Sequence, residues 1–141
     1  MGCVFCEVIS GAAEAAIVHR DEAAVVFLDK SPLFPGHCLI APVEHHETLP
    51  DLPPSLVAPL FGTVRRVAAA LEGGFGAQGS FVAMNNRISQ SVPHLHVHVV
   101  PRRRKDGLRG FFWPRTRYAG GLEEMRGVAR SIAEALDAVP G

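Results

Sequence analysis

Three histidines alternate with apolar residues in the last third of the chain, at His94, His96 and His98. Successive side chains of a β-strand point to opposite faces of the sheet. An extended segment therefore places all three imidazoles on one face and sends Leu95 and Val97 to the other. Neighbouring imidazoles would be about 7 Å apart along the strand. A row of imidazoles suits two kinds of chemistry: the binding of a metal ion, or the handling of a phosphate group with one imidazole as nucleophile.

Two cysteines near the N-terminus, Cys3 and Cys6, form a second group that could do chemistry. Their C-x-x-C spacing supplies two of the four ligands of a tetrahedral zinc site, so it indicates a metal or redox role rather than a disulfide. We disfavour a thioredoxin-like redox role because no helical pattern begins at Cys3 and no strand–helix–strand pattern surrounds it. The third cysteine, Cys38, lies in an apolar run and is expected in the core.

The composition indicates one folded domain with a net charge of zero. Of the 141 residues, 48% are hydrophobic, which suffices for a packed core, and 14 basic residues balance 14 acidic ones. The N-terminus lacks the pattern of a signal peptide and no run is long enough to cross a bilayer. We therefore expect a cytoplasmic protein that binds neither membranes nor nucleic acid. The run Arg102–Lys105 is a local exception, either a solvated loop or a patch that attracts a polyphosphate.

The hydrophobic pattern predicts an α+β fold with an antiparallel sheet and two main helices. Apolar and β-branched residues predict strands over residues 23–28, 37–41, 81–84 and 94–100. Apolar residues recur with a helical period over 60–71 and again over 122–136, whereas the apolar segment 4–9 shows no clear period. The order of strands, helix, strands and helix suits a sheet with its helices on one side.

This ordered set of motifs resembles the histidine triad (HIT) superfamily of nucleotide hydrolases and transferases. Residues 94–100 match its pattern His-φ-His-φ-His-φ-φ, where φ is an apolar residue. Four segments that precede the triad also match the family, in the order in which its members have them: Cys3–Cys6, Phe27–Pro32, Pro35–His45 and Asn85–Val92. The resemblance covers residues 3–105. It implies a HIT-like sheet in a single domain over 1–141, with a basic and aromatic extension and helix over 106–138, and a homodimer that shares its sheet.

The resemblance implies a covalent mechanism centred on His96. In this mechanism the central histidine attacks the α-phosphate of a nucleotide, and water then breaks the nucleotidyl-imidazole intermediate. Other residues would hold the phosphate oxygens, lie near the leaving group or support the triad: His94, His98, Gln90, Ser91 and His37. The mechanism requires no metal.

The resemblance also implies a pocket for an adenine or guanine nucleotide. Asp29 would accept hydrogen bonds from the ribose hydroxyls, and Asn85 would lie near the sugar-phosphate. Apolar residues would flank the base: Val4, Phe5, Val8, Phe27 and Leu28. Plain core packing remains the alternative for the aromatic and leucine side chains, and a turn at the end of a strand remains the alternative for Asp29.

Members of the superfamily with this N-terminus complete a zinc site with two histidines, which correspond to His45 and His94 here, with His46 as an alternative to His45. Such a closed Cys2His2 site would be structural, and it would link the N-terminal segment to the triad. The alternative is a pair of reduced thiols without a metal.

The chain also departs from the pattern. Pro93 precedes the triad, Ser89 stands where many members have glycine, and Trp113 leads into a long tail that is closer to the fragile histidine triad branch. The substrate therefore stays open between a dinucleoside polyphosphate and a nucleoside phosphoramidate, and the final acceptor could be water, phosphate or another group. Two other hypotheses stay open: a metal-dependent hydrolase with His94, His96 and His98 on one ion, and a nucleotide-binding protein without catalysis.

Overall fold

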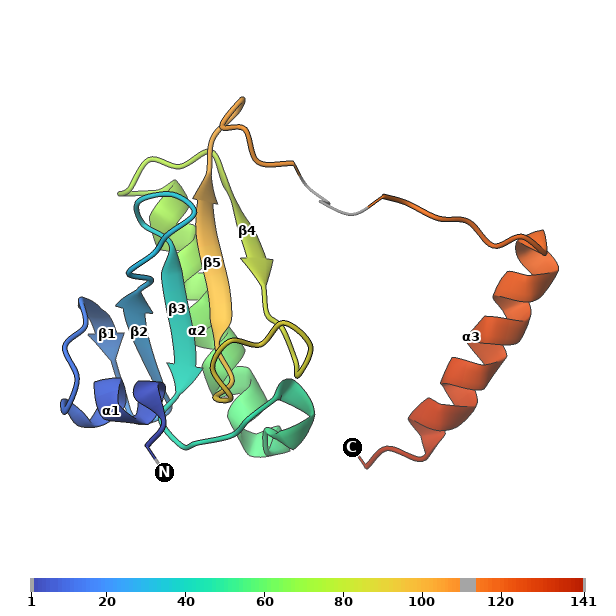
Figure 1. The fold of residues 1–141 in the computed structure, drawn as a ribbon, viewed down its shortest axis with the longest axis horizontal. Coiled ribbons are helices and arrows are strands. Elements are labelled where there is room, and N and C mark those ends of the chain that lie inside the picture. The colour runs from blue at the N-terminus through green and yellow to red at the C-terminus, as the bar shows by residue number, and fades with distance from the viewer. Residues whose placement is uncertain (1, 110–113, 141) are drawn as a thin grey trace. The chain divides into compact units, whose positions relative to one another are not determined.

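The computed structural model describes residues 2–109 and 114–140, in two compact units, Met1–Gly107 and Leu108–Gly141 (Figure 1). Trp113, which leads into the long tail of the sequence, lies outside the described residues. The first unit contains the sheet and all the histidines. The second unit contains one long helix.

The first unit is built on a five-stranded antiparallel sheet with the order β1-β2-β3-β5-β4. Its strands are β1 (Ile17–Arg20), β2 (Ala24–Leu28), β3 (Cys38–Pro42), β4 (Gly79–Ala83) and β5 (Val97–Arg102). The predicted α+β class with an antiparallel sheet is confirmed. Strand β1 was missed by the sequence interpretation, because its residues are mostly exposed and carry no strong apolar alternation.

The prediction that a strand begins at His94 is wrong, because β5 begins at Val97. The ladder between β3 and β5 ends where Ile40 pairs with Val97. Before that point, the N–H of Leu95 donates to the carbonyl of His46 in the loop after β3, outside the ladder. The side chains still alternate: Leu95 and Val97 both belong to the core on one face of the sheet, although only the second lies in the strand.

Three helical segments accompany the sheet in this unit: α1 (Val4–Ser10), the 3-10 turn η1 (Leu49–Asp51) and α2 (Pro54–Glu72). Helix α2 extends the predicted helix by two turns at its start, where Pro54 fits because the first helical residue needs no intrahelical N–H bond. Helix α1 contradicts the expectation that no helix begins after Cys3. Seven residues are too few to show a clear period, and Gly11 ends the helix in a left-handed conformation.

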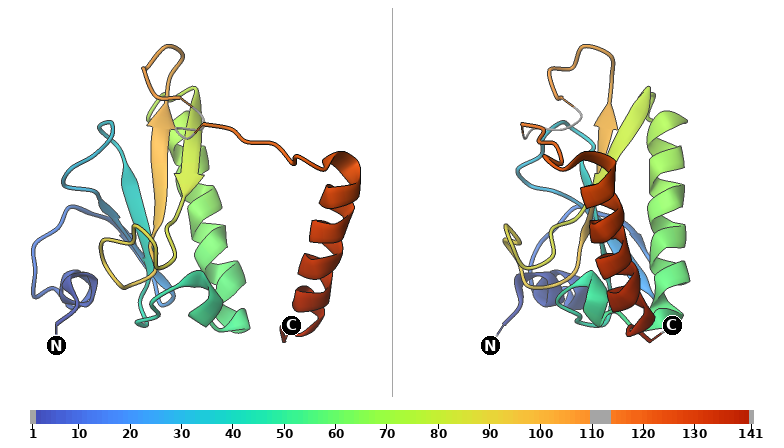
Figure 2. Two further views of the ribbon diagram at one scale, coloured as in Figure 1. Left: turned by 45° about the vertical axis from the view of Figure 1, so that its right-hand side comes forward. Right: turned by 90° about the vertical axis from the view of Figure 1, so that its right-hand side faces the viewer.

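The sheet is covered on both faces, which corrects the expectation of helices on one side (Figure 2). Alternate residues of β2 face α2, among them Val26, and the others face α1, among them Phe27. Because the central strands are buried on both faces, their sequences are continuously apolar rather than alternating. The core beneath α1 includes Phe5 and Val8 of that helix.

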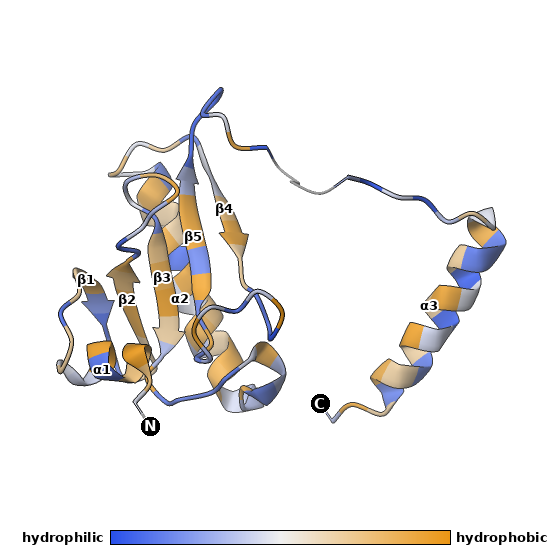
Figure 3. Cartoon of the chain, viewed as in Figure 1, coloured by the Kyte–Doolittle hydropathy of each residue, from blue (hydrophilic) through white to orange (hydrophobic). Residues whose placement is uncertain are grey.

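The second unit contains α3 (Gly121–Asp137), which is amphipathic and carries no buried side chain (Figure 3). Large apolar side chains are exposed along it: Leu122, Met125, Val128, Ile132 and Leu136. A single helix of this length keeps such a stripe in water only at a cost in free energy. Within residues 2–109 and 114–140, no helix is both long and apolar enough to span a membrane.

Candidate active site

The histidines of the triad lie close together on the face of the sheet that α1 covers. The ring centroids of His96 and His98 are 5.0 Å apart, shorter than the 7 Å expected along an ideal strand, and the two ring planes make an angle of 61°. His94 and His96 are buried, and His98 is partly buried. The three imidazoles therefore have limited access to solvent.

The hydrogen bonds of His96 assign its proton. Its Nδ1 lies 2.8 Å from the carbonyl oxygen of His94, and a carbonyl only accepts, so Nδ1 carries the hydrogen. In the neutral imidazole, Nε2 then keeps its lone pair. His96 lines a cleft of this unit, so the free nitrogen belongs to a residue that a ligand can reach.

A second hydrogen-bonded pair assigns the protons of His37 and His98. The backbone N–H of Leu33 donates to Nδ1 of His37, so the hydrogen of this neutral ring is on Nε2. That Nε2–H donates to Nδ1 of His98 over 2.9 Å, which leaves the hydrogen of His98 on Nε2. Burial is the main cause that lowers the pKa of His37, and burial together with His96 and His37 lowers the pKa of His98 to about 4. Both rings are therefore neutral near pH 7.

The same tautomers argue against a metal ion at Asp29, His37 and His98, although ligand atoms of these residues lie within 4.8 Å of one another. A metal would need the lone pair of His37 Nε2, which carries the hydrogen because Nδ1 accepts from Leu33. Asp29 lies 3.6 Å from this Nε2 and also accepts from the N–H of Ser31. His37 is hydrogen-bonded to His98 and orients it, and the Asp29 carboxylate lies beside His37 without a hydrogen bond to it.

His96 and His98 open onto a cleft with a volume of about 360 Å³. Nine of the predicted site residues line it: Val4, Phe5, Val8, Phe27, Leu28, Asp29, Ser91, His96 and His98. The lining of the cleft combines apolar side chains of α1 and β2 with the imidazoles of His96 and His98. This combination suits a ligand that is part planar ring and part phosphate.

Four of the residues predicted for catalysis or nucleotide binding do not line this cleft: His37, Asn85, Gln90 and His94. Gln90 donates to the carbonyl of Glu47 and accepts from the N–H of Arg87, so it braces its loop. Asn85 donates to the carbonyl of Ser89 in the same loop. Both residues support the position of Ser91 rather than face the cleft.

The cleft also has lining residues that the sequence interpretation missed: Ala13, Glu14, Ala15, Lys30, Leu39 and Val92. Lys30 directly follows Asp29. The predicted role of Asp29 was the one feature of the sequence that could have indicated Lys30 as a lining residue. Residues 13–15 follow α1, a helix that the sequence did not predict.

The loop before the triad holds unusual backbone angles. Arg87 and Ser89 have φ values of 71° and 60°, in the left-handed region that favours glycine. Ser89 is the position at which the resemblance leads one to expect glycine. The loop keeps this conformation with serine, and the hydrogen bond from Asn85 to its carbonyl helps to hold it.

The two cysteines meet two histidines at the start of α1. Cys3, Cys6, His45 and His94, which we call the Cys2His2 cluster, have ligand atoms within 4.8 Å of one another. The Sγ atoms of Cys3 and Cys6 each lie 3.6 Å from Nδ1 of His94, and Cys6 Sγ lies 3.3 Å from Nδ1 of His45. The two Nδ1 atoms are 3.1 Å apart.

These distances fit a tetrahedral zinc ion. Zinc bonds of about 2.3 Å to sulfur and 2.0 Å to nitrogen separate a sulfur from a nitrogen ligand by about 3.5 Å, and two nitrogens by about 3.3 Å. The Nε2–H of His94 donates to the carbonyl of Pro42, which leaves the Nδ1 lone pair directed at the cluster. Burial and the neighbouring Cys3 raise the pKa of Cys6, which disfavours the thiolate form of this residue. A bound cation favours the thiolate and so removes this penalty. The cluster is compatible with zinc.

The orientation of His94 bears on the hypothesis of three histidines on one ion. Both nitrogens of His94 are directed elsewhere, Nδ1 to the thiols and Nε2 to Pro42. Among the residues that the structure describes, neither group of metal-competent side chains contains His96. The arrangement therefore disfavours a shared ion and separates His94 from the other two histidines.

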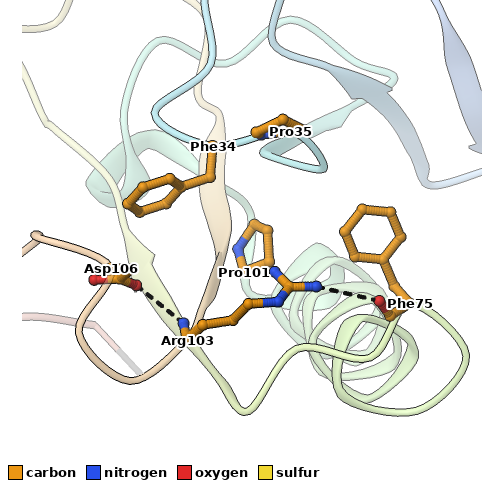
Figure 4. A pocket seen from close by; sticks show the side chains of 6 residues that line it. All are labelled: Phe34, Pro35, Phe75, Pro101, Arg103 and Asp106. Atoms are coloured by element: carbon orange, nitrogen blue, oxygen red, sulfur yellow. Dashed lines mark hydrogen bonds between the residues drawn. The ribbon is translucent and has the colours of Figure 1, made fainter.

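The basic run that begins with the last residue of β5 lies beside a second, smaller pocket of about 210 Å³ (Figure 4). Arg102 makes a two-point contact with Asp106, at 2.6 and 3.0 Å. The backbone N–H of Arg103 donates to the same carboxylate, and its guanidinium lies 5.9 Å from the centre of the Phe75 ring. Residues 102 and 103 therefore build a turn, as expected of a loop. Gly36 borders this turn at φ 100°, where a Cβ would approach Phe75 to 2.7 Å.

Comparison with known families settles the membership of the chain. A family model described as the HIT domain matches residues 10–105. The chain belongs to the HIT domain family. Among solved structures, a member of this family from Bacillus subtilis is 32% identical, with a TM-score of 0.84, over 95% of this chain and 96% of that chain. A Zn-bound histidine triad family protein from Mycobacterium smegmatis is 36% identical, with a TM-score of 0.72, over 96% and 98%.

Several curated relatives of this HIT domain protein carry names of enzymes. Adenylylsulfatase HINT3 of Arabidopsis thaliana is 34% identical over 75% of this chain and 55% of its own length. The asymmetrical bis(5'-nucleosyl)-tetraphosphatase of Schizosaccharomyces pombe is 35% identical over 64% of this chain and 50% of its own length. Adenosine 5'-monophosphoramidase hnt1 of the same yeast is 28% identical over 96% and 99%. The chain thus spans about half the length of the first two enzymes.

Proposed function

We propose that the protein is a nucleotide hydrolase or transferase that cleaves its substrate at the α-phosphate through a covalent intermediate on His96. The observation that carries this proposal is the hydrogen bond from Nδ1–H of His96 to the carbonyl of His94, which leaves Nε2 free in a residue that lines the cleft. A nucleophile needs such a lone pair, and a neutral imidazole supplies it near pH 7. The enzyme names among the relatives support the same chemistry.

The reaction has two displacements. Nε2 of His96 attacks the α-phosphorus and a P–N bond forms. The bond to the leaving group breaks, and the leaving group departs with the electron pair and then takes a proton. Water or another acceptor next attacks the same phosphorus, loses its proton to the medium, and returns the P–N electron pair to the imidazole. Nε2–H of His98 is placed by His37 to donate to a phosphoryl oxygen in both steps.

The substrate is a nucleotide with its base against the apolar side chains of the cleft and its ribose near Asp29. The relatives named above act on an adenylyl sulfate, a dinucleoside tetraphosphate and a phosphoramidate, respectively. We propose an adenine or guanine nucleotide of one of these classes. No step requires a metal, and the Cys2His2 cluster would hold zinc as a structural ion. Reduced thiols of such a site suit the cytoplasm, where we place the protein.

The test compares wild type with His96→Ala on a diadenosine polyphosphate, an adenosine phosphoramidate and adenylyl sulfate. We expect release of AMP by wild type and a loss of at least about a thousandfold in the variant, as for the removal of a covalent nucleophile. Mass spectrometry after an alkaline quench should find a nucleotidyl adduct on the peptide that contains His96. His19→Ala is the matched control, because this exposed histidine pairs with Asp21 outside the cleft.

Two outcomes would contradict the proposal. Substantial activity in His96→Ala would remove this residue as the nucleophile. Activity that EDTA still abolishes in Cys6→Ser, which lacks a ligand of the Cys2His2 cluster, would indicate metal-dependent chemistry. Addition of inorganic phosphate separates a hydrolase from a phosphorylase, because the second would release ADP from an adenylyl intermediate.

A further inference from the structure

One side chain of α1, Phe5, touches both the Cys2His2 cluster and the triad. In the sequence Phe5 stands between the two thiols of the cluster, two residues after Cys3 and one before Cys6. Its ring is buried and meets the imidazole of His96 edge to face, with centroids 4.8 Å apart and planes at 87°. It also meets the ring of His94 at 6.0 Å. A single side chain therefore connects the metal ligands with the nucleophile.

The same ring forms part of the wall of the cleft. Phe5 packs against Phe27 of β2 with centroids 5.2 Å apart and planes at 77°, and both rings line the cleft. Edge-to-face contacts of this kind favour one relative orientation of the rings. A shift of Phe5 would therefore change the shape of the cleft and the freedom of the His96 ring together.

The position of Phe5 depends on how α1 is held. The helix has seven residues, too few to be stable alone, and its N-cap residue Cys3 makes no side-chain capping bond. Its C-terminal end is fixed by Gly11 and by a hydrogen bond from Arg20 to the carbonyl of Ile9. At its N-terminal end, Cys3 and Cys6 face the histidines of the cluster. A metal ion there would fix the first turn, which includes Phe5.

We propose that Phe5 is a positioning residue that couples metal binding at the Cys2His2 cluster to the orientation of His96 and to the affinity of the cleft for nucleotides. The inference rests on the proposed function, because it places a nucleotide in the cleft. Binding free energies are linked reciprocally. The factor by which zinc strengthens nucleotide binding must equal the factor by which a nucleotide strengthens zinc binding.

The reciprocal effect can be measured on the zinc-loaded full chain without an assay of activity. The dissociation constant of zinc is determined by competition with a chromophoric chelator, with and without saturating AMP. In wild type we expect AMP to tighten zinc binding about tenfold, within the usual range of such couplings. In Phe5→Leu the effect of AMP should fall below about twofold, while zinc affinity without AMP stays within about threefold of wild type. Phe5→Met, with a similar side-chain volume, should behave like Phe5→Leu.

Phe61→Leu is the matched control, because this ring lies on α2 and packs against the core on the other face of the sheet. It should keep the full effect of AMP. The second readout is the NMR signal of the His96 ring, which senses the nearby aromatic ring. This signal should shift on zinc removal in wild type and in Phe61→Leu, and should hardly shift in Phe5→Leu.

The outcomes separate this inference from the proposed function. If calorimetry shows that zinc-loaded wild type does not bind AMP, the nucleotide cleft is wrong and both proposals fall. If AMP binds but leaves the zinc affinity unchanged, or if Phe5→Leu and Phe5→Met keep the full effect of AMP, the coupling through Phe5 is overturned and the proposed function stands.

Discussion

At the scale of single residues, the hydrogen bonds around His98 explain why a histidine outside the triad matters. His37 fixes the tautomer of His98 because its own Nδ1 is occupied by the N–H of Leu33. We predict that His37→Phe, which keeps a ring of similar size and removes the donor, lowers kcat by about 10- to 100-fold. KM should change by less than about threefold, because His37 does not line the cleft.

Steady-state kinetics on the best substrate checks this prediction, with His19→Phe as the control that alters an exposed histidine. A variant that loses affinity for substrate but keeps kcat would show that His37 shapes the cleft instead of orienting His98.

The lowered pKa of His98 has a consequence for stability. An unfolded histidine has a pKa near 6.5, whereas that of folded His98 is about 4, mainly because of burial. Between these values the unfolded chain binds more protons than the folded one, so the free energy of unfolding falls as pH falls from 6.5 to 4. From this group alone we expect a loss of about 2 kcal/mol between pH 7.5 and pH 5.

Urea unfolding at pH 7.5, 6 and 5 measures the effect. His98→Phe should flatten this part of the pH profile, and His19→Phe should not. An unchanged slope in His98→Phe would show that His98 does not carry the depressed pKa.

The motifs pick out residues that lie together in the structure, but not the directions of all their side chains. His96, Asp29 and Phe27, which the motifs assign to the site, all line the cleft. Gln90 and Asn85 belong to the same motifs, yet the side chain of Asn85 bonds within its own loop and that of Gln90 bonds to Arg87 of this loop and to the carbonyl of Glu47. A motif records which residues occur together, whereas the direction of a side chain depends on backbone angles such as the positive φ of Ser89, which the sequence does not display.

At the scale of elements, the Cys2His2 cluster holds the start of α1 to the segment before β5. Binding of an ion to the folded state alone raises stability in proportion to the logarithm of its concentration. We predict that zinc at about a hundred times its dissociation constant adds about 2.7 kcal/mol to the stability of wild type. Cys6→Ser should lose most of this gain, because it removes a ligand that faces both His45 and His94.

Thermal unfolding with and without added zinc checks the prediction. Cys38→Ala is the control: this buried thiol lies in the other core and outside the cluster, so the variant should keep the zinc-dependent gain. Equal gains in Cys6→Ser and wild type would mean that the cluster does not bind the ion.

The elements also show why the ends of a strand or helix were harder to predict than its type of secondary structure. Strands β2 and β3 are buried on both faces, and their continuous apolar runs predicted them as strands. The start of β5 depends on where the ladder with β3 ends at Ile40, a non-local event that the alternation of histidines cannot reveal. Helix α1 is stabilised by Phe5 and Val8 against the sheet, so its helical state follows from tertiary contacts rather than from local periodicity.

At the scale of the whole molecule, we propose one HIT domain with a core over residues 3–105 and an extension with a helix over 106–138. The family model covers 10–105, within this core. Helix α3 has no apolar core of its own, and its stripe Leu122, Met125, Ala129, Ile132 and Leu136 repeats with spacings of 3 and 4 residues. Such a seam is typical of helices that pack against another helix.

We also propose that the chain forms a homodimer. Strand β4 is an edge of the sheet, with Val82 exposed on it, and an edge strand can pair with another copy. Light scattering after gel filtration should give twice the chain mass of 15.1 kDa. Val82→Lys should raise the dissociation constant at least about tenfold if the sheet is shared, because a charge at the edge opposes pairing.

Helix α3 provides an independent test of the same assembly. Ile132→Glu places a charge in the apolar seam, and burial of a large aliphatic side chain contributes about 1.5–3 kcal/mol, so the dimer should weaken at least about tenfold if the seam is an interface. Ser131→Glu is the matched control, since it adds the same charge beside the seam and should leave the mass unchanged. Weakening by Val82→Lys alone would assign the contact to the sheet, weakening by Ile132→Glu alone would assign it to α3, and a monomeric wild type would refute the dimer.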